Sequence, residues 1–399
     1  MQRGLLVLAM LALIVPAHAA GGNLFAQLQT VVTSYLAERQ QPERITGVAL
    51  HVEIRNRPAI DVFAGTDGRG QPIGPATLFQ IGSNTKHFTA ALVLKLESEG
   101  RLDIRQTVGH WLPQYPAWKN VTIRSLLSMT SPIPNYSETP DFVATLAKDP
   151  QHEFSYPDLV AYVYDRGLPV PSGWFYSNTN NILAAMIIEK AARMSYGEAL
   201  RTMLIAPLGL RNTFYADGPY PPSVLNRLPA GIYDNEECAL YQPQPCTETV
   251  WAPLVGKDVS RMNLSWAGPA GGIISDMDDL AAWIRALFAL RVIPQKQLRE
   301  MTSLVSTGTG RPIAQTTSGD PSAFGLDLAR RYDAKLGSFW FYQGTTLGFR
   351  AIFGYWPQYG LLITTATNSQ PAQGEDKLGQ IVVGGAFAAV RKAGLLSRK

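Results

Sequence analysis

The sequence predicts an α/β fold in which one sheet takes strands from both ends of the chain. Near the N-terminus a helical pattern precedes a strand-like run, and near the C-terminus three strand-like runs precede a helical pattern. These segments are residues 24–39, 48–54, the stretches near Phe339, Ala351 and Leu361, and residues 378–392. We expect helices from both chain ends to flank the sheet, with a helix-rich lobe between them.

Size and composition are those of one large enzyme-sized domain. The chain has 399 residues, 46% of them hydrophobic and 17% charged, and no long linker or repeat divides it. We predict a single domain over residues 20–399, with an α/β lobe at about 20–82 and 254–399 and a helix-rich lobe at about 83–253. The formal charge of +4 includes no long cationic run, so we do not expect nucleic acid as a partner.

The N-terminus reads as a secretory signal peptide over residues 1–19. Arg3 precedes an apolar run over residues 4–15, and small residues at Ala17 and Ala19 predict cleavage near Ala19 or Ala20. The run is short for a bilayer span, although an uncleaved anchor is the alternative. We therefore expect a periplasmic or secreted protein with no stable membrane span after cleavage.

Export gives a meaning to the two cysteines. Cys238 and Cys246 lie close together in a turn-rich segment, and in an oxidising compartment this spacing predicts a local disulfide. Neither cysteine stands in a metal-binding spacing, and the histidines are scattered along the chain. The sequence therefore predicts neither a metal nor another cofactor.

A first motif places a nucleophile beside a base. Gly82 frees the backbone, Ser83 begins a helical pattern that ends at Gly100, and Lys86 follows three residues after the serine. Residues three apart share one face of a helix, so the lysine amine can lie beside the serine hydroxyl. A serine needs such a base to become a good nucleophile. Alone, a Ser-x-x-Lys match arises by chance and is more often a surface turn.

Two further motifs follow at longer range. Tyr176, Ser177 and Asn178 stand at the entrance of another helical pattern, behind a turn-rich stretch. Residues 342–344, Tyr-Gln-Gly, stand between strand-like runs, where Gly344 lets the backbone of an edge strand approach a ligand closely. On its own this third motif would read as a plain hairpin between two core strands.

The three motifs together resemble the penicillin-recognising serine hydrolases, which include class C β-lactamases, D-alanyl-D-alanine carboxypeptidases and family VIII esterases. Connecting segments share the resemblance, which covers nearly the whole mature chain. They are residues 99–103, 121–127, 207–210 and 270–275. The resemblance implies a β-lactamase/transpeptidase-like fold with an antiparallel sheet.

The resemblance also implies a role for each motif residue. Ser83 would become acylated while Lys86 and Tyr176 share the proton transfers. Asn178 would hydrogen-bond Lys86 and the amide side chain of the substrate, and the backbone amides of Ser83 and Thr345 would form the oxyanion hole. Free lysine and tyrosine both titrate near pH 10, so one pKa must fall by roughly 3 units, or about 4 kcal/mol, for a base at neutral pH. The sequence does not choose between them.

The third motif departs from the pattern of β-lactam and DD-peptide specialists, which usually carry Lys-Thr-Gly or His-Thr-Gly there. Tyr342 and Gln343 supply neither the cation nor the hydroxyl, although Thr345 offers a hydroxyl and Arg350 a cation if it faces the site. A lone arginine on a strand is more often a solvated surface residue. With Asn178 and Gly344, these residues are the candidates for substrate binding.

The resulting interpretation is an exported serine hydrolase that acts through an acyl-enzyme on Ser83. Amide hydrolysis of the β-lactamase or DD-peptidase type ranks first, with a small-molecule or peptidoglycan-derived acyl substrate. A carboxylesterase of the same fold is the close alternative. A non-catalytic penicillin-binding or sensor module is a third hypothesis, which the intact Ser83, Lys86 and Tyr176 set argues against.

Overall fold

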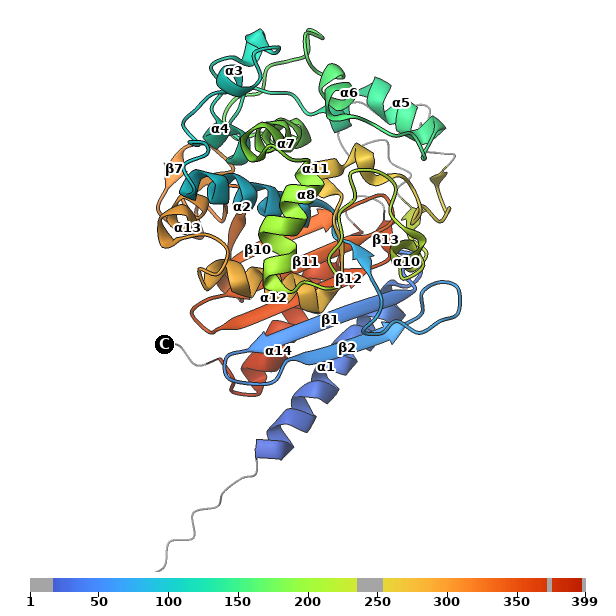
Figure 1. Cartoon of the computed structure of the whole chain (residues 1–399). Helices are drawn as coiled ribbons and strands as arrows, with labels where there is room; N and C mark the ends of the chain where they lie inside the picture. The colour runs from blue at the N-terminus through green and yellow to red at the C-terminus, as the bar shows by residue number, and fades with distance from the viewer. Residues whose placement is uncertain (1–16, 235–253, 372–374, 397–399) are drawn as a thin grey trace, which may run out of the picture.

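A computed structural model describes residues 17–234, 254–371 and 375–396 of the chain (Figure 1). Its main feature is a nine-stranded sheet in which every pairing is antiparallel. In spatial order the strands are β2 (Ile60–Gly65), β1 (Gly47–Ile54), β12 (Leu361–Thr367), β11 (Arg350–Trp356), β10 (Gly337–Thr345), β9 (Ala329–Asp333), β8 (Ser322–Phe324), β6 (Leu304–Ser306) and β7 (Pro312–Ile313). Strand β1 pairs with β12, which confirms that the sheet joins the two ends of the chain.

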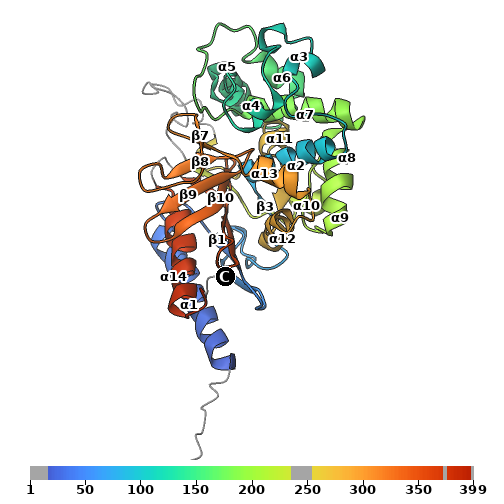
Figure 2. The same cartoon turned by 90° about the vertical axis from the view of Figure 1, so that its left-hand side faces the viewer.

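Helices from the two termini pack on one face of this sheet. Helix α1 (Ala17–Arg39) lies beside α14 (Gly384–Lys392), as Figure 2 shows. The predicted C-terminal helix is present, but its first part, η8 (Leu378–Val383), is π-helical. Alternate residues of β1 beginning with Val48 are buried against these helices in one apolar cluster. The burial follows from the two-residue period of a strand.

The remaining helices lie on the side of the other face of the sheet, where α12 packs against β1 and β12, and they share a second and larger apolar cluster. They are α2 (Thr85–Ser98), α3 (Val108–Trp111), α4 (Ile123–Leu127), α5 (Pro140–Lys148), α6 (Tyr156–Ala161), α7 (Asn178–Ala192), α8 (Tyr196–Leu200), α9 (Ala206–Leu208), α10 (Pro222–Leu225), α11 (Gly268–Gly271), α12 (Met277–Phe288) and α13 (Gln295–Met301). Two small pairings complete the layout: β3 (Phe79–Gln80) with β5 (Ile274–Ser275), and β4 (Ile232–Asp234) with β13 (Ser369–Pro371). Shorter helical turns are η1 (Gly82–Asn84), η2 (Pro116–Trp118), η3 (Tyr136–Glu138), η4 (Arg201–Ile205) and η7 (Leu264–Trp266).

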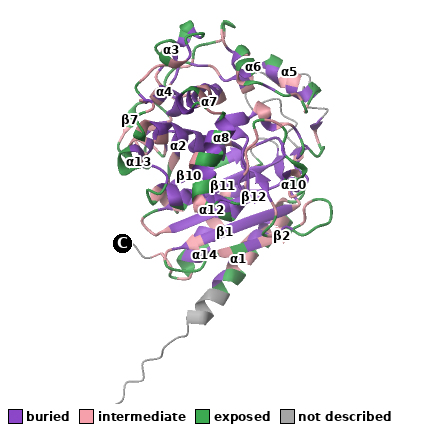
Figure 3. Ribbon diagram, viewed as in Figure 1, coloured by how far each residue is buried: buried purple, intermediate pink, exposed green. Residues whose placement is uncertain are grey.

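Helix α2 runs through the interior of the molecule. It is buried almost all round, as its purple colour in Figure 3 shows, and it packs against α7 and α11. A helix that is apolar on all sides belongs in a core. Thr85 and Lys86, near its start, are therefore enclosed by packed neighbours.

Parts of two predictions fall outside the described residues. Most of the predicted signal peptide lies within residues 1–16, and Cys238 and Cys246 lie within residues 235–253. In the part of the chain that is described, no helix combines the length and the apolar character needed to cross a bilayer.

Candidate active site

Ser83 stands at the start of the buried helix α2, where the chain leaves β3 through the turn η1. Gly82 makes this turn with a φ of +51°, in the left-handed region that favours glycine. A side chain is also excluded there, since a Cβ on Gly82 would lie 2.5 Å from Thr345 N. The turn leaves Ser83 half-buried at a helix N-terminus, where the helix dipole favours developing negative charge.

Lys86 lies one helical turn further on and is fully buried. Its Nζ is hydrogen-bonded to Ser83 Oγ at 3.0 Å and donates to Ala270 O at 2.7 Å, which confirms the proximity predicted from the spacing. Burial lowers the pKa of Lys86 to about 7, although attraction to Asp327 opposes this shift. Of the two bases left open by the sequence, the lysine therefore has a physical reason to be an amine near neutral pH.

Tyr176 approaches the serine from the other side. Its OH donates to Ser83 Oγ at 2.8 Å, and its ring centroid lies 4.8 Å from Lys86 Nζ. Tyr342 OH in turn donates to Tyr176 OH at 3.5 Å, while burial raises the pKa of Tyr342. The chain thus brings together the serine, the lysine and the tyrosine that the sequence singled out.

The end of β10 runs directly past the start of α2. Strand β9 pairs only with residues 337–341, so residues 342–345 form a local edge although β10 is an inner strand. A Cβ on Gly344 would lie 1.9 Å from Ile81 O and 2.7 Å from Ser83 N. Gly344 is therefore needed for the strand to approach the helix start, whereas the sequence suggested an approach to a ligand. The backbones around Ser83 and Thr345, the two expected oxyanion donors, are thus brought close together.

Asn178, one of the predicted site residues, takes a partner other than the expected one. Asn178 Nδ2 donates to Ser137 Oγ at 2.9 Å, while the hydrogen bonds of Lys86 go to Ser83 and Ala270, so the expected Asn178–Lys86 bond is not formed. The reason is a local turn: Asn135 Oδ1 accepts from the backbone N–H of Asn178 and orients that residue toward Ser137.

Arg350 does not face the site. It is fully buried, and its Nη1 donates to Glu43 and to Asp376, each at 2.6 Å. Gln343 is drawn into the same group, because its Nε2 donates to Asp376. The arginine is therefore neither a solvated surface residue nor a cation for a substrate.

A cleft of about 440 Å³ opens beside the nucleophile. Besides Ser83, Tyr176 and Thr345, its walls include Trp174, Phe324 and Arg330. Sequence reasoning missed Arg330. The available signal was the pair Arg330–Arg331 on a strand, because adjacent strand residues point to opposite faces and one of two arginines must then face inward.

Arg330 is a half-buried cation. Its guanidinium lies 4.9 Å from the ring centroid of Trp340, and its Nε is buried without a hydrogen-bond partner. Within residues 17–234, 254–371 and 375–396, no acidic side chain forms an ion pair with it. The cleft therefore carries a positive charge that no acidic group of the described residues pairs with.

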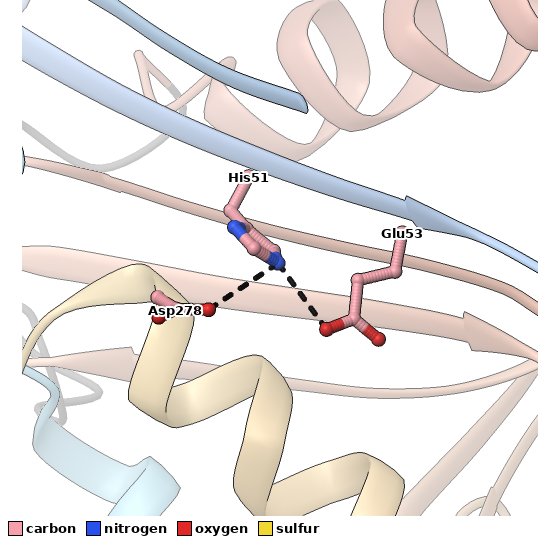
Figure 4. A group of neighbouring side chains, drawn as sticks. All are labelled: His51, Glu53 and Asp278. Atoms are coloured by element: carbon pink, nitrogen blue, oxygen red, sulfur yellow. Dashed lines mark hydrogen bonds and ion pairs between the residues drawn. The ribbon is translucent and has the colours of Figure 1, made fainter. Parts of the chain in front are cut away.

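A group with ligand atoms of the kind that bind metals lies elsewhere, between β1 and α12. The ligand atoms of His51, Glu53 and Asp278 all lie within 4.8 Å of one another (Figure 4). Arg285 pairs with Glu53, and Asp61 lies 2.7 Å from His51 Nδ1. Although burial opposes it, hydrogen bonding to Asp61 and Glu53 raises the pKa of His51 to about 9. At neutral pH the group is thus a compensated ion-pair cluster, and none of its members lines the cleft.

Comparison with known proteins finds relatives in the family that the three motifs resemble. The family model described as Beta-lactamase matches residues 32–384. Penicillin-binding protein 4* of Bacillus subtilis is 32% identical over 185 residues, which is 45% of this chain and 40% of that protein. A β-lactamase of Providencia stuartii is 28% identical over 196 residues, 48% of each protein. The chain thus matches less than half the length of these two curated relatives.

Two solved structures match over almost their full length. A D-stereospecific amidohydrolase from Streptomyces superimposes with a TM-score of 0.71 at 27% identity, over 91% of this chain and 98% of that one. A D-amino acid amidase from Ochrobactrum anthropi gives a TM-score of 0.74 at 22% identity, over 93% and 99% of the two chains, and this likeness concerns the fold alone. With the β-lactamase/transpeptidase-like fold and the family model in agreement, the chain belongs to the β-lactamase family.

Proposed function

We propose that this chain is an amidohydrolase that works through an acyl-enzyme on Ser83. One observation carries the proposal: a single hydroxyl, Ser83 Oγ, is hydrogen-bonded both to Lys86 Nζ and to Tyr176 OH. Acyl transfer from an amide needs one group to take the proton of the nucleophile and another to give a proton to the leaving nitrogen. The contacts of Lys86 and Tyr176 with Ser83 support these two roles.

In the first step Lys86, as the amine, takes the serine proton while Ser83 Oγ bonds to the acyl carbon. The carbonyl electron pair moves to its oxygen, which the amides of Ser83 and Thr345 stabilise. The C–N bond then breaks as Tyr176 gives its proton to the departing nitrogen, and Tyr176 recovers a proton from the Lys86 ammonium. Water cleaves the resulting ester by the same transfers in reverse and releases the acid.

Amide substrates are favoured over esters by this arrangement. An amine leaves only when its nitrogen is protonated, and Tyr176 provides a proton beside the scissile bond. The likeness to a D-stereospecific amidohydrolase adds support. A carboxylesterase is the second candidate, favoured by the absence of lysine or histidine at residues 342–343 and by the pairing of Gln343 with Asp376.

The cation of the cleft bears on the class of acyl substrate. We propose that Arg330 binds an anionic group of the substrate, in place of the cation missing from the third motif. A guanidinium stacked on an aromatic ring keeps its edge available for a carboxylate, which it binds with two parallel hydrogen bonds. β-Lactams and peptides with a free C-terminal carboxylate are substrates of this class.

A time course of intact-protein mass spectra and amine release tests both parts. The panel is a penicillin, a D-alanyl-D-alanine peptide, the same peptide as its C-terminal amide, and an activated ester. Wild type should form an adduct on Ser83 that Ser83→Ala lacks, and turn it over. Arg330→Gln should lose about tenfold or more in kcat/KM for the free carboxylate and change little for the amide.

The matched control is Arg331→Gln, a neighbouring and exposed arginine outside the cleft, which should leave both activities unchanged. Hydrolysis of the ester without any amide would favour the carboxylesterase. A stable adduct without turnover would favour the sensor module. Equal losses in both arginine variants would refute the role given to Arg330.

We also propose that the enzyme works in the periplasm or outside the cell, because residues 1–19 have the pattern of a cleaved signal peptide. N-terminal sequencing of the protein from an osmotic-shock fraction tests this. A mature end near Ala20 is expected, and an intact Met1 in a cytosolic fraction would refute it.

A further inference from the structure

Asn84, the residue after the nucleophile, carries a fully buried polar side chain that the mechanism above does not use. It stands at the position just before helix α2, where an asparagine side chain commonly accepts a hydrogen bond from a backbone N–H of the first helical turn. The side chain of Asn84 makes no such bond. Because burying a carboxamide costs free energy unless it is hydrogen-bonded, its partners lie elsewhere.

The carboxamide of Asn84 donates in two directions. Its Nδ2 donates to Ile81 O in the turn before the nucleophile and to Ala351 O on β11, each at 2.9 Å. Both acceptors are carbonyl oxygens, so the nitrogen of the carboxamide, and not its oxygen, must face them. Oδ1 is buried and finds no partner among the described residues. The side chain is thus placed by what it donates, and we call its two hydrogen bonds the Asn84 bridge.

The Asn84 bridge joins the turn to the strands at the point where β10 passes it. Ala351, one acceptor, is the register partner of Gly344 on β10. Ile81 O, the other acceptor, is the atom that a Cβ on Gly344 would meet first, at 1.9 Å. The bridge therefore fastens η1 to the pair of strands β10 and β11 exactly beside their closest backbone approach.

The two proposed oxyanion donors lie beside this bridge. Ser83 N would lie 2.7 Å from a Cβ on Gly344, and Thr345 N would lie 2.5 Å from a Cβ on Gly82. An oxyanion hole works only while its donors stay at hydrogen-bond distance from the developing charge, and a misplacement of about 1 Å costs about a hundredfold in rate. One donor belongs to the turn and the other to β10, so the spacing between them depends on how the turn is held against the strand.

We propose that Asn84 is a positioning residue of the reaction: the Asn84 bridge holds the amides of Ser83 and Thr345 at the spacing that the oxyanion requires. This inference rests on the proposed function of the Ser83 site. Asn84 touches no substrate atom and transfers no proton in the step. Its effect arises as charge develops on the carbonyl oxygen, so its loss should lower kcat more than it raises KM.

A pair of activated esters tests this, one with the ordinary carbonyl oxygen and one with sulfur in its place. Both need the same nucleophile, base and leaving group. Sulfur is larger and accepts hydrogen bonds more weakly, so only the oxygen ester gains fully from the two amides. In Asn84→Leu, which keeps the size of the side chain and removes both N–H groups, kcat/KM should fall about tenfold or more for the oxygen ester and by less than about threefold for the sulfur ester.

Asn84→Asp keeps the shape of the side chain and has no N–H, so it should lower the ratio of the two rates in the same direction. The matched control is Asn368→Leu. Asn368 is another fully buried asparagine, its Nδ2 donates to Thr46 Oγ1 and Ala230 O, and it does not line the cleft. This control should lose stability and keep the wild-type ratio.

A purely structural role for Asn84 would lower both ester rates by one factor, because it would only reduce the amount of folded enzyme. A wild-type ratio in both Asn84 variants, with wild type active, refutes this inference alone. Wild type that forms no acyl adduct on Ser83 with either ester refutes the proposed function of that site instead.

Discussion

Gly344→Ala offers a sharp test of how the fold positions the reacting groups. A Cβ at residue 344 would lie 1.9 Å from Ile81 O, and contacts of a Cβ below 3.0 Å essentially do not occur. Strand β10 and the turn before Ser83 must therefore separate by about 1 Å (3.0 − 1.9 = 1.1 Å). The clash is with backbone on both sides, so no side-chain rotation can relieve it.

The displacement falls next to Thr345, whose amide is one of the two proposed oxyanion donors. A misplacement of 1 Å, or the loss of one oxyanion donor, costs about a hundredfold in rate, or about 2.7 kcal/mol. We expect acylation of Ser83 by an amide to slow by about this factor in Gly344→Ala. Overpacking should also lower the free energy of unfolding by about 1–3 kcal/mol.

Stopped-flow acylation and thermal unfolding measure the two effects on one preparation. Gly319→Ala is the control, since the nearest atom to a Cβ there is 3.9 Å away and φ is not positive. It should acylate at the wild-type rate. If Gly344→Ala folds and acylates within threefold of wild type, the close passage of β10 does not set the oxyanion geometry.

Three further outcomes follow from the same structure. Tyr176→Phe should slow amide hydrolysis far more than hydrolysis of an activated ester, whose leaving group needs no proton; equal losses would contradict the role of proton donor. In wild type, kcat/KM should rise with pH through a midpoint near 7, the pKa of Lys86, and a flat profile between pH 5 and 9 would exclude the lysine as base. His51→Gln should reduce the free energy of unfolding most below pH 6.5 and least above pH 9. The pKa of His51 is about 9 in the folded protein and about 6.5 in the unfolded chain, so the charged ring stabilises the fold at low pH and this contribution is lost as the pH rises through 9. The loss of unfolding free energy is at most about 3 kcal/mol, and solvent screening at the half-exposed Asp61 reduces it to about 1–2 kcal/mol. Urea titration of wild type and variant at both pH values measures it.

The parts of the site that the sequence predicted are the local ones. Ser83 and Lys86 are three residues apart on one helix, so the helical period alone placed the amine beside the hydroxyl. Tyr176 lies 93 positions from Ser83, and only the resemblance to a family joined the two. Strand-like runs near both chain ends predicted one sheet that takes both ends, and the pairing of β1 with β12 confirms this.

What the sequence did not predict depends on long-range packing. Asn178 turns away from Lys86 because of hydrogen bonds to a turn some forty positions earlier, which no local pattern encodes. Asp327 stands as a single acid in an apolar stretch over residues 324–328, and that was the available signal. That its carboxyl is buried and accepts a hydrogen bond from Asn181 of α7 follows only from how the fold brings the two segments together.

The two arginines of the sheet show why a cation's role does not follow from its place in the sequence. Arg350 stands on β11 and Arg330 on β9, yet Arg350 is enclosed by Glu43 and Asp376, whereas Arg330 has a tryptophan ring for its neighbour. A fully buried arginine is stable only with such carboxylates, and removing one partner from a buried pair costs about 3–5 kcal/mol. The ion pair of Arg350 with Asp376 thus links β11 to the segment around Asp376. Asp376 also accepts a hydrogen bond from Gln343 near the end of β10. Arg330 keeps contact with solvent, so its charge needs no fixed partner. Its guanidinium can therefore bind an anionic group of a substrate reversibly. Selection for an anionic substrate would act on Arg330, and selection for a rigid site would act on Arg350.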